Sequence, residues 1–222
     1  MKVIILAAGY ATRLYPKTKN TPKALLQYKD RVVLDYILDD LNHYLITEII
    51  IVTNHKFYDQ FDKYIKNRKE NISLIDDKST DNSNRLGALN DLKLALNDIR
   101  DDILIMASDN ILDFSINNFI DYYYKDNISS IMYYEEYDIN KLNKTGQAVI
   151  KDNKLIEFKE KPKNMISIYA VPPFYIFNSK DIKYIKEIKE SFDSLGSIIE
   201  LIYKKIDIKC YKMIGKRIDI GS

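Results

Sequence analysis

The fold is decided at the start of the chain, which reads K-V-I-I-L-A-A-G-Y-A-T-R-L over residues 2–14. Residues 2–6 form a short apolar run with Val and Ile, the pattern of a buried parallel strand. The run breaks into a loop of small residues, Ala7, Ala8 and Gly9, which leave backbone N–H groups bare. Bare amides at the carboxyl end of a first strand are where open α/β sheets bind phosphates. This stretch therefore predicts an α/β fold with an anion site beside its first strand.

Two cations, Arg13 and Lys23, follow this loop. The segment contains no Gly-Lys-Ser/Thr and no G-x-G-x-x-G, so it is neither a P-loop nor a dinucleotide fingerprint. It resembles the signature of the sugar-phosphate nucleotidyltransferases, L-A-A-G-x-G-T-R-L-x-P-x-T with P-K nine residues after the arginine. Every element matches except the second glycine, which is Ala11 here. The structural alternative is a glycine turn after a core strand, with two solvated cations.

The resemblance implies that this loop holds a nucleoside triphosphate. Arg13 and the Gly9 loop would hold the β- and γ-phosphates, and Lys23 would contact the α-phosphate. Both reactants are anions, so catalysis must come from positioning and charge neutralisation, and Arg13 and Lys23 are predicted to be catalytic. The implied nucleotide-binding residues are Leu6, Ala7, Ala8, Gly9, Tyr10, Arg13, Lys23, Gly87 and Asp109.

Gly87 lies in the run R-L-G-A-L (residues 85–89), where a helical apolar pattern begins. In the family a loop-to-helix turn at this position packs against the nucleotide base, and a glycine permits close approach of a planar base. A glycine that only helps the helix to pack is the alternative.

Composition limits the class of protein. The 222 residues can bury a full core, and 30% charged residues exclude a membrane protein. The net charge of +2 gives no reason to expect nucleic acid or a membrane surface as a partner. The single cysteine, Cys210, excludes a disulfide within the chain and fits a reducing compartment. The first apolar run is too short for a signal peptide, so we expect a cytoplasmic protein.

The first half of the chain alternates strand and helix patterns. Helical spacing predicts helices over about 32–44 and 57–65, and buried strands are predicted at 48–53, 72–75 and 103–107. This order predicts a Rossmann-like parallel sheet flanked by helices. The resemblance implies that the sheet is mixed but mostly parallel and has a smaller acceptor-binding lobe beside it. This is the fold of the nucleotide-diphospho-sugar transferases that the signature resembles.

Asp109 follows the strand at 103–107 in the segment Ser108-Asp109-Asn110. A carboxylate at the carboxyl end of a parallel strand points into the ligand crevice. In the family the matching G-D-N segment supplies a metal-binding aspartate, which implies that Asp109 holds Mg²⁺ as a hard oxygen ligand. The alternative is an ordinary turn or cap residue.

We expect one domain over residues 1–222, with a nucleotide-binding half over about 1–113 and an acceptor-binding half over about 114–222. The second half contains a predicted hairpin over 146–158 that leads into E-K-P at 160–162. In the family the glycine, glutamate and lysine of this region contact the sugar phosphate. The acceptor-binding residues implied here are Gly146, Glu160, Lys161 and Val171, of which Lys161 is also predicted to be catalytic.

The strand predicted at 170–177 contains Pro172-Pro173, where the family has a glycine in place of the second proline. Two prolines remove two ladder donors, which predicts a sheet edge or a bulge. Helices at about 179–190 and 194–204 and a strand at 206–213 are expected to follow.

The chain closes on G-K-R-I-D-I-G-S (residues 215–222), which resembles the family's W-x-D-x-G-T. The aspartate of that motif is the second metal ligand, which implies that Asp219 joins Asp109 in holding Mg²⁺. Arg217 stands where the family has a tryptophan.

The implied reaction is a Mg²⁺-dependent transfer of a nucleoside monophosphate from an NTP to a sugar 1-phosphate, with release of pyrophosphate. The sugar-binding E-K-P favours dTTP or UTP with a hexose 1-phosphate. One alternative is a cytidylyltransferase for a phosphocholine-like or other small phosphorylated acceptor. Another is an inactive nucleotide-binding regulatory subunit, which Arg217 and Pro173 favour. The family is often oligomeric, so a homo-oligomer is compatible with the resemblance.

Overall fold

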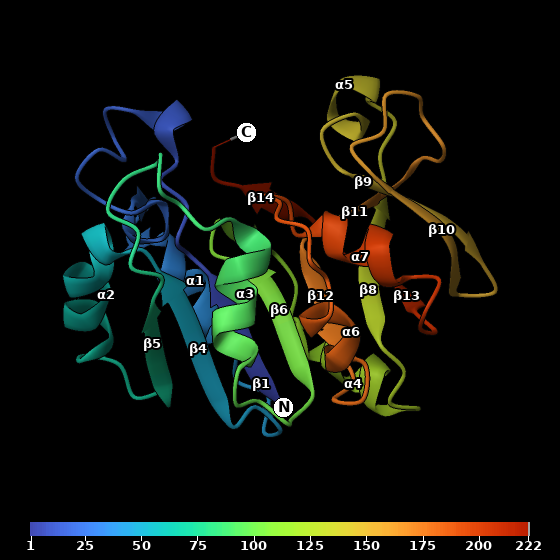
Figure 1. Ribbon diagram of the computed structural model, residues 1–222, viewed down its shortest axis with the longest axis horizontal. Coiled ribbons are helices and arrows are strands. Elements are labelled where there is room, and N and C mark those ends of the chain that lie inside the picture. Colours follow the sequence, from blue (N-terminus) through green and yellow to red (C-terminus); the bar gives the residue numbers. More distant parts are fainter. Residues whose placement is uncertain (222) are drawn as a thin grey trace.

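Parallel strands form one side of the central sheet, as the alternating pattern predicts. They are β1 (Lys2–Leu6), β4 (Glu48–Thr53), β5 (Ile72–Asp76) and β6 (Ile103–Ala107). The structure is a computed structural model that describes residues 1–221, and in it these strands lie in the order β5-β4-β1-β6 (Figure 1). Leu6 pairs with Val52 on one side and Ala107 on the other, so the strands end at the same level. The loops that follow them therefore meet at one edge of the sheet.

The second half of the chain extends the same sheet, mostly through antiparallel pairs. Its strands are β8 (Ser130–Glu135), β9 (Gly146–Lys151), β10 (Lys154–Glu160), β11 (Tyr169–Val171), β12 (Phe174–Phe177) and β13 (Lys209–Lys212). β12 pairs with both β6 and β8, which joins the two halves in one ten-stranded sheet. β9 and β10 form the predicted hairpin, and β8, β11, β9, β10 and β13 pair in a ring. The mixed α/β fold is thus confirmed.

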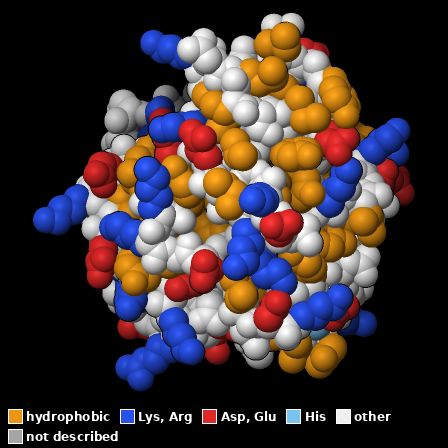
Figure 2. All heavy atoms as spheres, turned by 90° about the vertical axis from the view of Figure 1, so that its right-hand side faces the viewer, with side chains coloured by type: hydrophobic (Ala, Val, Ile, Leu, Met, Phe, Trp, Pro, Cys, Tyr) orange, Lys and Arg blue, Asp and Glu red, His pale blue; other side chains and the backbone are white. Residues whose placement is uncertain are grey.

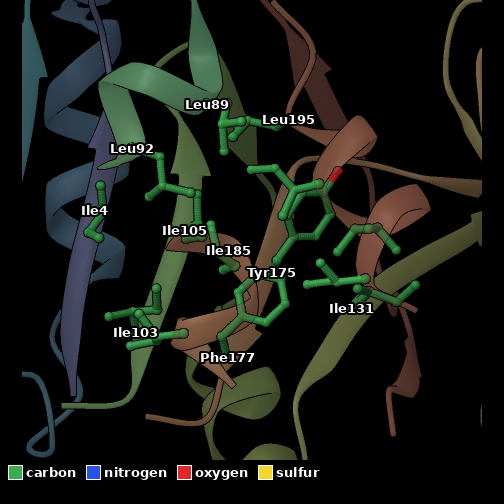
Figure 3. Packing of buried hydrophobic residues seen from close by; sticks show 14 of the residues in the cluster. Ile4, Leu89, Leu92, Ile103, Ile105, Ile131, Tyr175, Phe177, Ile185 and Leu195 are labelled. Atoms are coloured by element: carbon green, nitrogen blue, oxygen red, sulfur yellow. The ribbon is translucent and has the colours of Figure 1, made fainter. Parts of the chain in front are cut away.

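Helices cover both faces of this sheet. The helices are α1 (Val33–Asp40), α2 (Tyr58–Ile65), α3 (Ala88–Leu96), α4 (Asn117–Tyr124), α5 (Ile139–Leu142), α6 (Ile182–Lys186) and α7 (Gly196–Ile202). Side chains of β1 alternate between two cores, with Ile4 in one and Val3 and Ile5 in the other. Figure 3 shows the core under α3, where Leu89 lies beside Leu195. None of the helices within residues 1–221 is long and apolar enough to cross a bilayer.

Several elements are shorter than the apolar pattern predicts. The helix predicted at 32–44 is α1, which ends at Asp40, although Leu41 beyond it is still buried. The helices predicted at 179–190 and 194–204 are the short α6 and α7. Buried residues in turns continue the apolar spacing past the last helical hydrogen bond, and this makes the helices look longer in the sequence.

The two prolines do not mark a sheet edge. Pro172 and Pro173 separate β11 from β12, so the strand predicted at 170–177 is two strands, because neither proline can donate to a ladder. β12 nevertheless lies in the interior of the sheet, between β6 and β8.

Two short strands outside the main sheet hold residues 217–219 beside the segment that follows β6. β7 (Asn110–Leu112) follows β6 directly, and β14 (Arg217–Asp219) pairs with it antiparallel. A second small pair joins β2 (Gln27–Tyr28) to β3 (Arg31–Val32). The β7–β14 pair places residues 217–219 at the carboxyl edge of the parallel strands.

Candidate active site

The loop after β1 forms the floor of a cavity of about 220 Å³. Ala7 continues the strand by donating its N–H to the Val52 carbonyl at 2.8 Å. Ala7 and Ala8 are buried, whereas Gly9 is exposed, and a Cβ at Gly9 would meet nothing within 4 Å. The loop therefore offers a backbone surface to a ligand at that point. The residues that line the cavity are Leu6, Ala7, Gly9, Ala11, Lys23, Ala24, Ala107, Ser108 and Asp109.

Ala11 adopts the left-handed conformation, with φ 46° and ψ 42°. This is the position where the family signature has its second glycine, and a left-handed alanine costs about 1–2 kcal/mol. Its carbonyl accepts hydrogen bonds from the Thr18 hydroxyl at 2.8 Å and from the Leu14 N–H at 2.9 Å. Thr18 is fully buried, so the threonine of the signature helps to hold the loop in its shape.

Asn54, which the sequence analysis did not single out, fixes the other side of the loop. It is fully buried, and its amide donates to the Ala8 carbonyl at 2.9 Å. Its side-chain oxygen accepts the Phe57 N–H at 3.0 Å. Asn54 therefore joins the loop after β1 to the turn after β4.

Asn54→Ala is expected to lower the free energy of unfolding by about 1–3 kcal/mol, because it leaves the Ala8 carbonyl buried without its partner and removes the shorter of the two hydrogen bonds of the Phe57 N–H, which keeps only the backbone carbonyl of residue 54 at 3.3 Å. Urea unfolding measures this. Asn67→Ala, at an exposed position, is the matched control and is expected to change stability by less than about 0.5 kcal/mol. Equal stability of the two variants would contradict the role of Asn54.

Lys23, Asp109 and Asp219 meet beside this cavity. The Lys23 Nζ lies 2.6 Å from Asp109 Oδ2 and 3.6 Å from Asp219 Oδ1. Asp109 lies in the turn between β6 and β7, and pairing of β14 with β7 places Asp219 opposite Asn110. The Ile220 N–H also donates to the Asp109 carbonyl at 2.9 Å. Sheet pairing thus brings together two carboxylates that are far apart in the sequence.

The donor set at this point fits Mg²⁺. Two carboxylates supply hard oxygen ligands, and Mg²⁺ in phosphate-transfer sites usually takes one or two carboxylates and completes its shell with water and phosphate oxygens. Among residues 1–221 no cluster of three or more acidic, His or Cys side chains could hold a metal ion. Ligation by Asp109 and Asp219 alone would leave the other positions around the ion to water and phosphate oxygens.

The other predicted phosphate-binding cation, Arg13, is exposed on the short 3₁₀ turn Thr12–Leu14. Its guanidinium makes no hydrogen bond or ion pair with another residue in the part of the chain that the structure describes. Tyr10, by contrast, is buried, and its hydroxyl hydrogen-bonds with that of Ser79 at 3.1 Å. Tyr10 therefore supports the loop, whereas Arg13 is available to an anion.

The predicted acceptor residues also come together, around the Glu160 carboxylate. This side chain is only 10% exposed and lies between two glycines: a Cβ would come within 2.9 Å of its Oε2 at Gly146 and within 1.8 Å at Gly196. The Ser194 hydroxyl donates to Glu160 Oε1. Lys161, whose Nζ lies 3.6 Å from the same oxygen, is half exposed. Ser194 and Gly196 belong to no recognised motif, so sequence reasoning missed them.

Two predicted residues contact protein in ways that the signature did not indicate. Val171 pairs with Gly146 in the sheet, and its side chain is buried in the core. Gly87 has φ 84°, and a Cβ there would lie 3.0 Å from Asp193 Oδ1 and 3.1 Å from the Phe192 carbonyl. This contact favours the packing explanation of Gly87, and its contact with a base stays a prediction.

Asp91, in the first turn of α3, shares a buried site with Asp77. Burial, and then the Asp77 carboxylate, raise the pKa of Asp91 to about 7. Because the folded-state pKa lies above the unfolded one, the native state binds the extra proton between about pH 4 and about pH 7, and stability falls as pH rises through that window.

Asp91→Asn is therefore expected to remove this slope and to be more stable than the parent protein at pH 8 by about 1–3 kcal/mol. An asparagine amide can also donate to Asp77. Urea unfolding at pH 5 and pH 8 tests this, and a variant less stable than the parent at pH 8 would contradict it.

Comparison with known proteins finds a family that matches almost the whole chain. The family described as Nucleotidyl transferase matches residues 2–222. A structure from Bacillus anthracis, assigned as a glucose-1-phosphate thymidylyltransferase, superposes with a TM-score of 0.86 at 26% identity, covering 100% of this chain and 90% of that one.

Curated relatives give the same picture. The bifunctional protein GlmU of Methanococcus aeolicus is 29% identical over 226 residues, which cover 100% of this chain and 52% of the relative. The choline-phosphate cytidylyltransferase of Streptococcus pneumoniae is 42% identical over 84 residues, 38% of this chain and 36% of the relative. The chain spans between 36% and 60% of the length of the first curated relatives that it matches. With a match over almost its full length, this chain belongs to the nucleotidyl transferase family.

Proposed function

We propose that this protein transfers a nucleoside monophosphate from an NTP to a sugar 1-phosphate, with Mg²⁺ as cofactor and pyrophosphate as the second product. The observation that carries the proposal is the meeting of Lys23 with Asp109 and Asp219 beside the loop after β1. Transfer of a nucleoside monophosphate from one phosphate group to another requires positive charge around the phosphates. A lysine and two carboxylates that can bind a metal ion, next to a loop that can bind an anion, meet this requirement.

Each residue has a role in this scheme. The Gly9 loop and Arg13 hold the β- and γ-phosphates, and Lys23 contacts the α-phosphate. Asp109 and Asp219 hold Mg²⁺, which supplies charge neutralisation at the α-phosphate. An acceptor phosphate oxygen attacks the α-phosphorus, and the bond from that phosphorus to the pyrophosphate oxygen breaks. The acceptor phosphate is already ionised at neutral pH, so no general base is needed.

The acceptor lies on the Glu160 side of the site in this proposal. A buried carboxylate can accept two hydroxyl hydrogen bonds from a sugar, and Lys161 neutralises the acceptor phosphate. The lobe with Gly146 and Glu160 favours a hexose 1-phosphate, with dTTP or UTP as the donor. The thymidylyltransferase assignment of the similar structure supports that choice.

A second candidate is a cytidylyltransferase for a small phosphorylated acceptor. The observation that favours it is the 42% identity over 84 residues to a choline-phosphate cytidylyltransferase. In that case CTP and a phosphocholine-like acceptor replace the sugar substrates, and the phosphate and metal roles stay the same.

The test is pyrophosphate release from the four common ribonucleoside triphosphates and dTTP, each combined with hexose 1-phosphates or phosphocholine. Release with dTTP or UTP and a hexose 1-phosphate supports the first proposal, and release only with CTP and phosphocholine supports the second. Binding of an NTP without release from any pair would support a regulatory subunit instead.

A further inference from the structure

The Lys23 ammonium lies between the carboxylates of Asp109 and Asp219, the two predicted metal ligands. Its Nζ is 2.6 Å from Asp109 Oδ2 and 3.6 Å from Asp219 Oδ1. All three side chains are largely enclosed, with exposed fractions of 17% for Lys23, 27% for Asp109 and 28% for Asp219. A cation is thus part of the site before any ligand enters.

The second oxygen of each carboxylate is held from the opposite side. The Asn110 amide donates to Asp109 Oδ1, and the Arg217 guanidinium donates to Asp219 Oδ2 at 3.2 Å. The same Arg217 nitrogen also donates to the Asn110 side-chain oxygen. This chain of hydrogen bonds orients both carboxylates so that Asp109 Oδ2 and Asp219 Oδ1 face Lys23.

Gly221 limits where the Lys23 side chain can go. A Cβ at Gly221 would lie 3.0 Å from both Cε and Nζ of Lys23, and the φ of 127° at this position favours glycine. The backbone near the end of the chain therefore packs directly against the lysine. Lys23 and Arg217 together balance the charge of the two carboxylates, so a bare divalent cation finds no net negative charge among these four groups.

We infer that Lys23 is an internal counter-ion that competes with the metal ion for Asp109 and Asp219. The inference rests on the proposed function, since it assigns the metal to these carboxylates. When the metal enters with a nucleotide, the ammonium exchanges its carboxylate partners for phosphate oxygens. The metal takes the two carboxylates away from Lys23, and the nucleotide gives Lys23 new partners in its phosphate oxygens. Metal and nucleotide therefore bind with positive coupling.

Mn²⁺ binding to the nucleotide-free chain of residues 1–222 tests this without turnover. Free Mn²⁺ is counted by electron paramagnetic resonance, and Mn²⁺ uses the same oxygen ligands as Mg²⁺. Lys23→Met is expected to bind Mn²⁺ about tenfold more tightly than the parent protein, a coupling of ordinary size. Lys23→Arg keeps the charge and is expected to bind Mn²⁺ as weakly as the parent.

Lys17→Met is the matched control, since it removes an equal charge from an exposed position in the same loop. Equal gains in Lys17→Met and Lys23→Met, or no gain in Lys23→Met, would overturn the inference. Adding Asp109→Asn to Lys23→Met is expected to abolish the gain, and a gain that persists would place the ion elsewhere and overturn it too. These titrations do not depend on pyrophosphate release, so the proposed function can fail independently.

Discussion

Asp109→Asn is expected to lower kcat by about 10²–10³-fold, because a neutral amide oxygen binds the divalent ion that neutralises charge at the α-phosphate far more weakly than a carboxylate does. The fold is expected to survive. Asparagine can still accept the Lys23 hydrogen bond through its one oxygen, and the Ile220 N–H donates to the backbone carbonyl of residue 109, which does not change, but the hydrogen bond from the Asn110 amide to the second carboxylate oxygen is lost. The free energy of unfolding is therefore expected to fall by about 1–3 kcal/mol, the effect of losing one hydrogen bond to a charged group.

Steady-state pyrophosphate release and urea unfolding on the same preparations measure both effects. Asp98→Asn, an identical substitution at an exposed position after α3, is the control and is expected to keep full turnover. Turnover of Asp109→Asn within a few-fold of the parent protein would remove Asp109 from the metal site.

Gly196→Ala is expected to lower kcat/KM for the acceptor by about 10–100-fold, the effect of losing a charged hydrogen bond of about 1.5–3 kcal/mol. The new Cβ would lie 1.8 Å from Glu160 Oε2, so the carboxylate must leave its place between Gly146 and Gly196. Only the end of a flexible side chain moves, and alanine is a better helix residue than glycine, so stability is expected to stay within about 1 kcal/mol of the parent.

The affinity for the NTP is expected to remain unchanged, because the new Cβ displaces the Glu160 carboxylate, which is assigned to the acceptor and not to the NTP. Glu160→Ala provides the matched comparison. If both variants act through the same carboxylate, the double variant loses no more activity than Glu160→Ala alone. Additive losses would show that Gly196 acts by another route.

The sequence predicts the parallel strands and the loop after β1 well, because their signals are local. An apolar run bounded by small residues determines β1, and the bounds predicted for the strand at 48–53 are those of β4. The left-handed backbone at Ala11 is a conformation that favours glycine, which accounts for the glycine at this position of the family signature.

The contacts that complete the site depend on tertiary structure. Asp219 reaches Asp109 through the pairing of β14 with β7, which no local pattern indicates. Asn54 and Ser194 contact the site from a turn and a loop whose sequences resemble any other polar segment. The resemblance implied a role for Asp219, because the family motif contains this aspartate. It implied none for Arg217, because the motif has a tryptophan there, and the hydrogen bonds of Arg217 follow from the fold.

The most direct test of the central claim is mass spectrometry of the products formed from one NTP and one phosphorylated acceptor, with Mg²⁺ and with a chelator. The account predicts a nucleoside monophosphate joined to the acceptor, with an equal amount of pyrophosphate, and neither product in the chelator. Hydrolysis of the NTP without transfer to any acceptor, or equal product formation in the chelator, would contradict it.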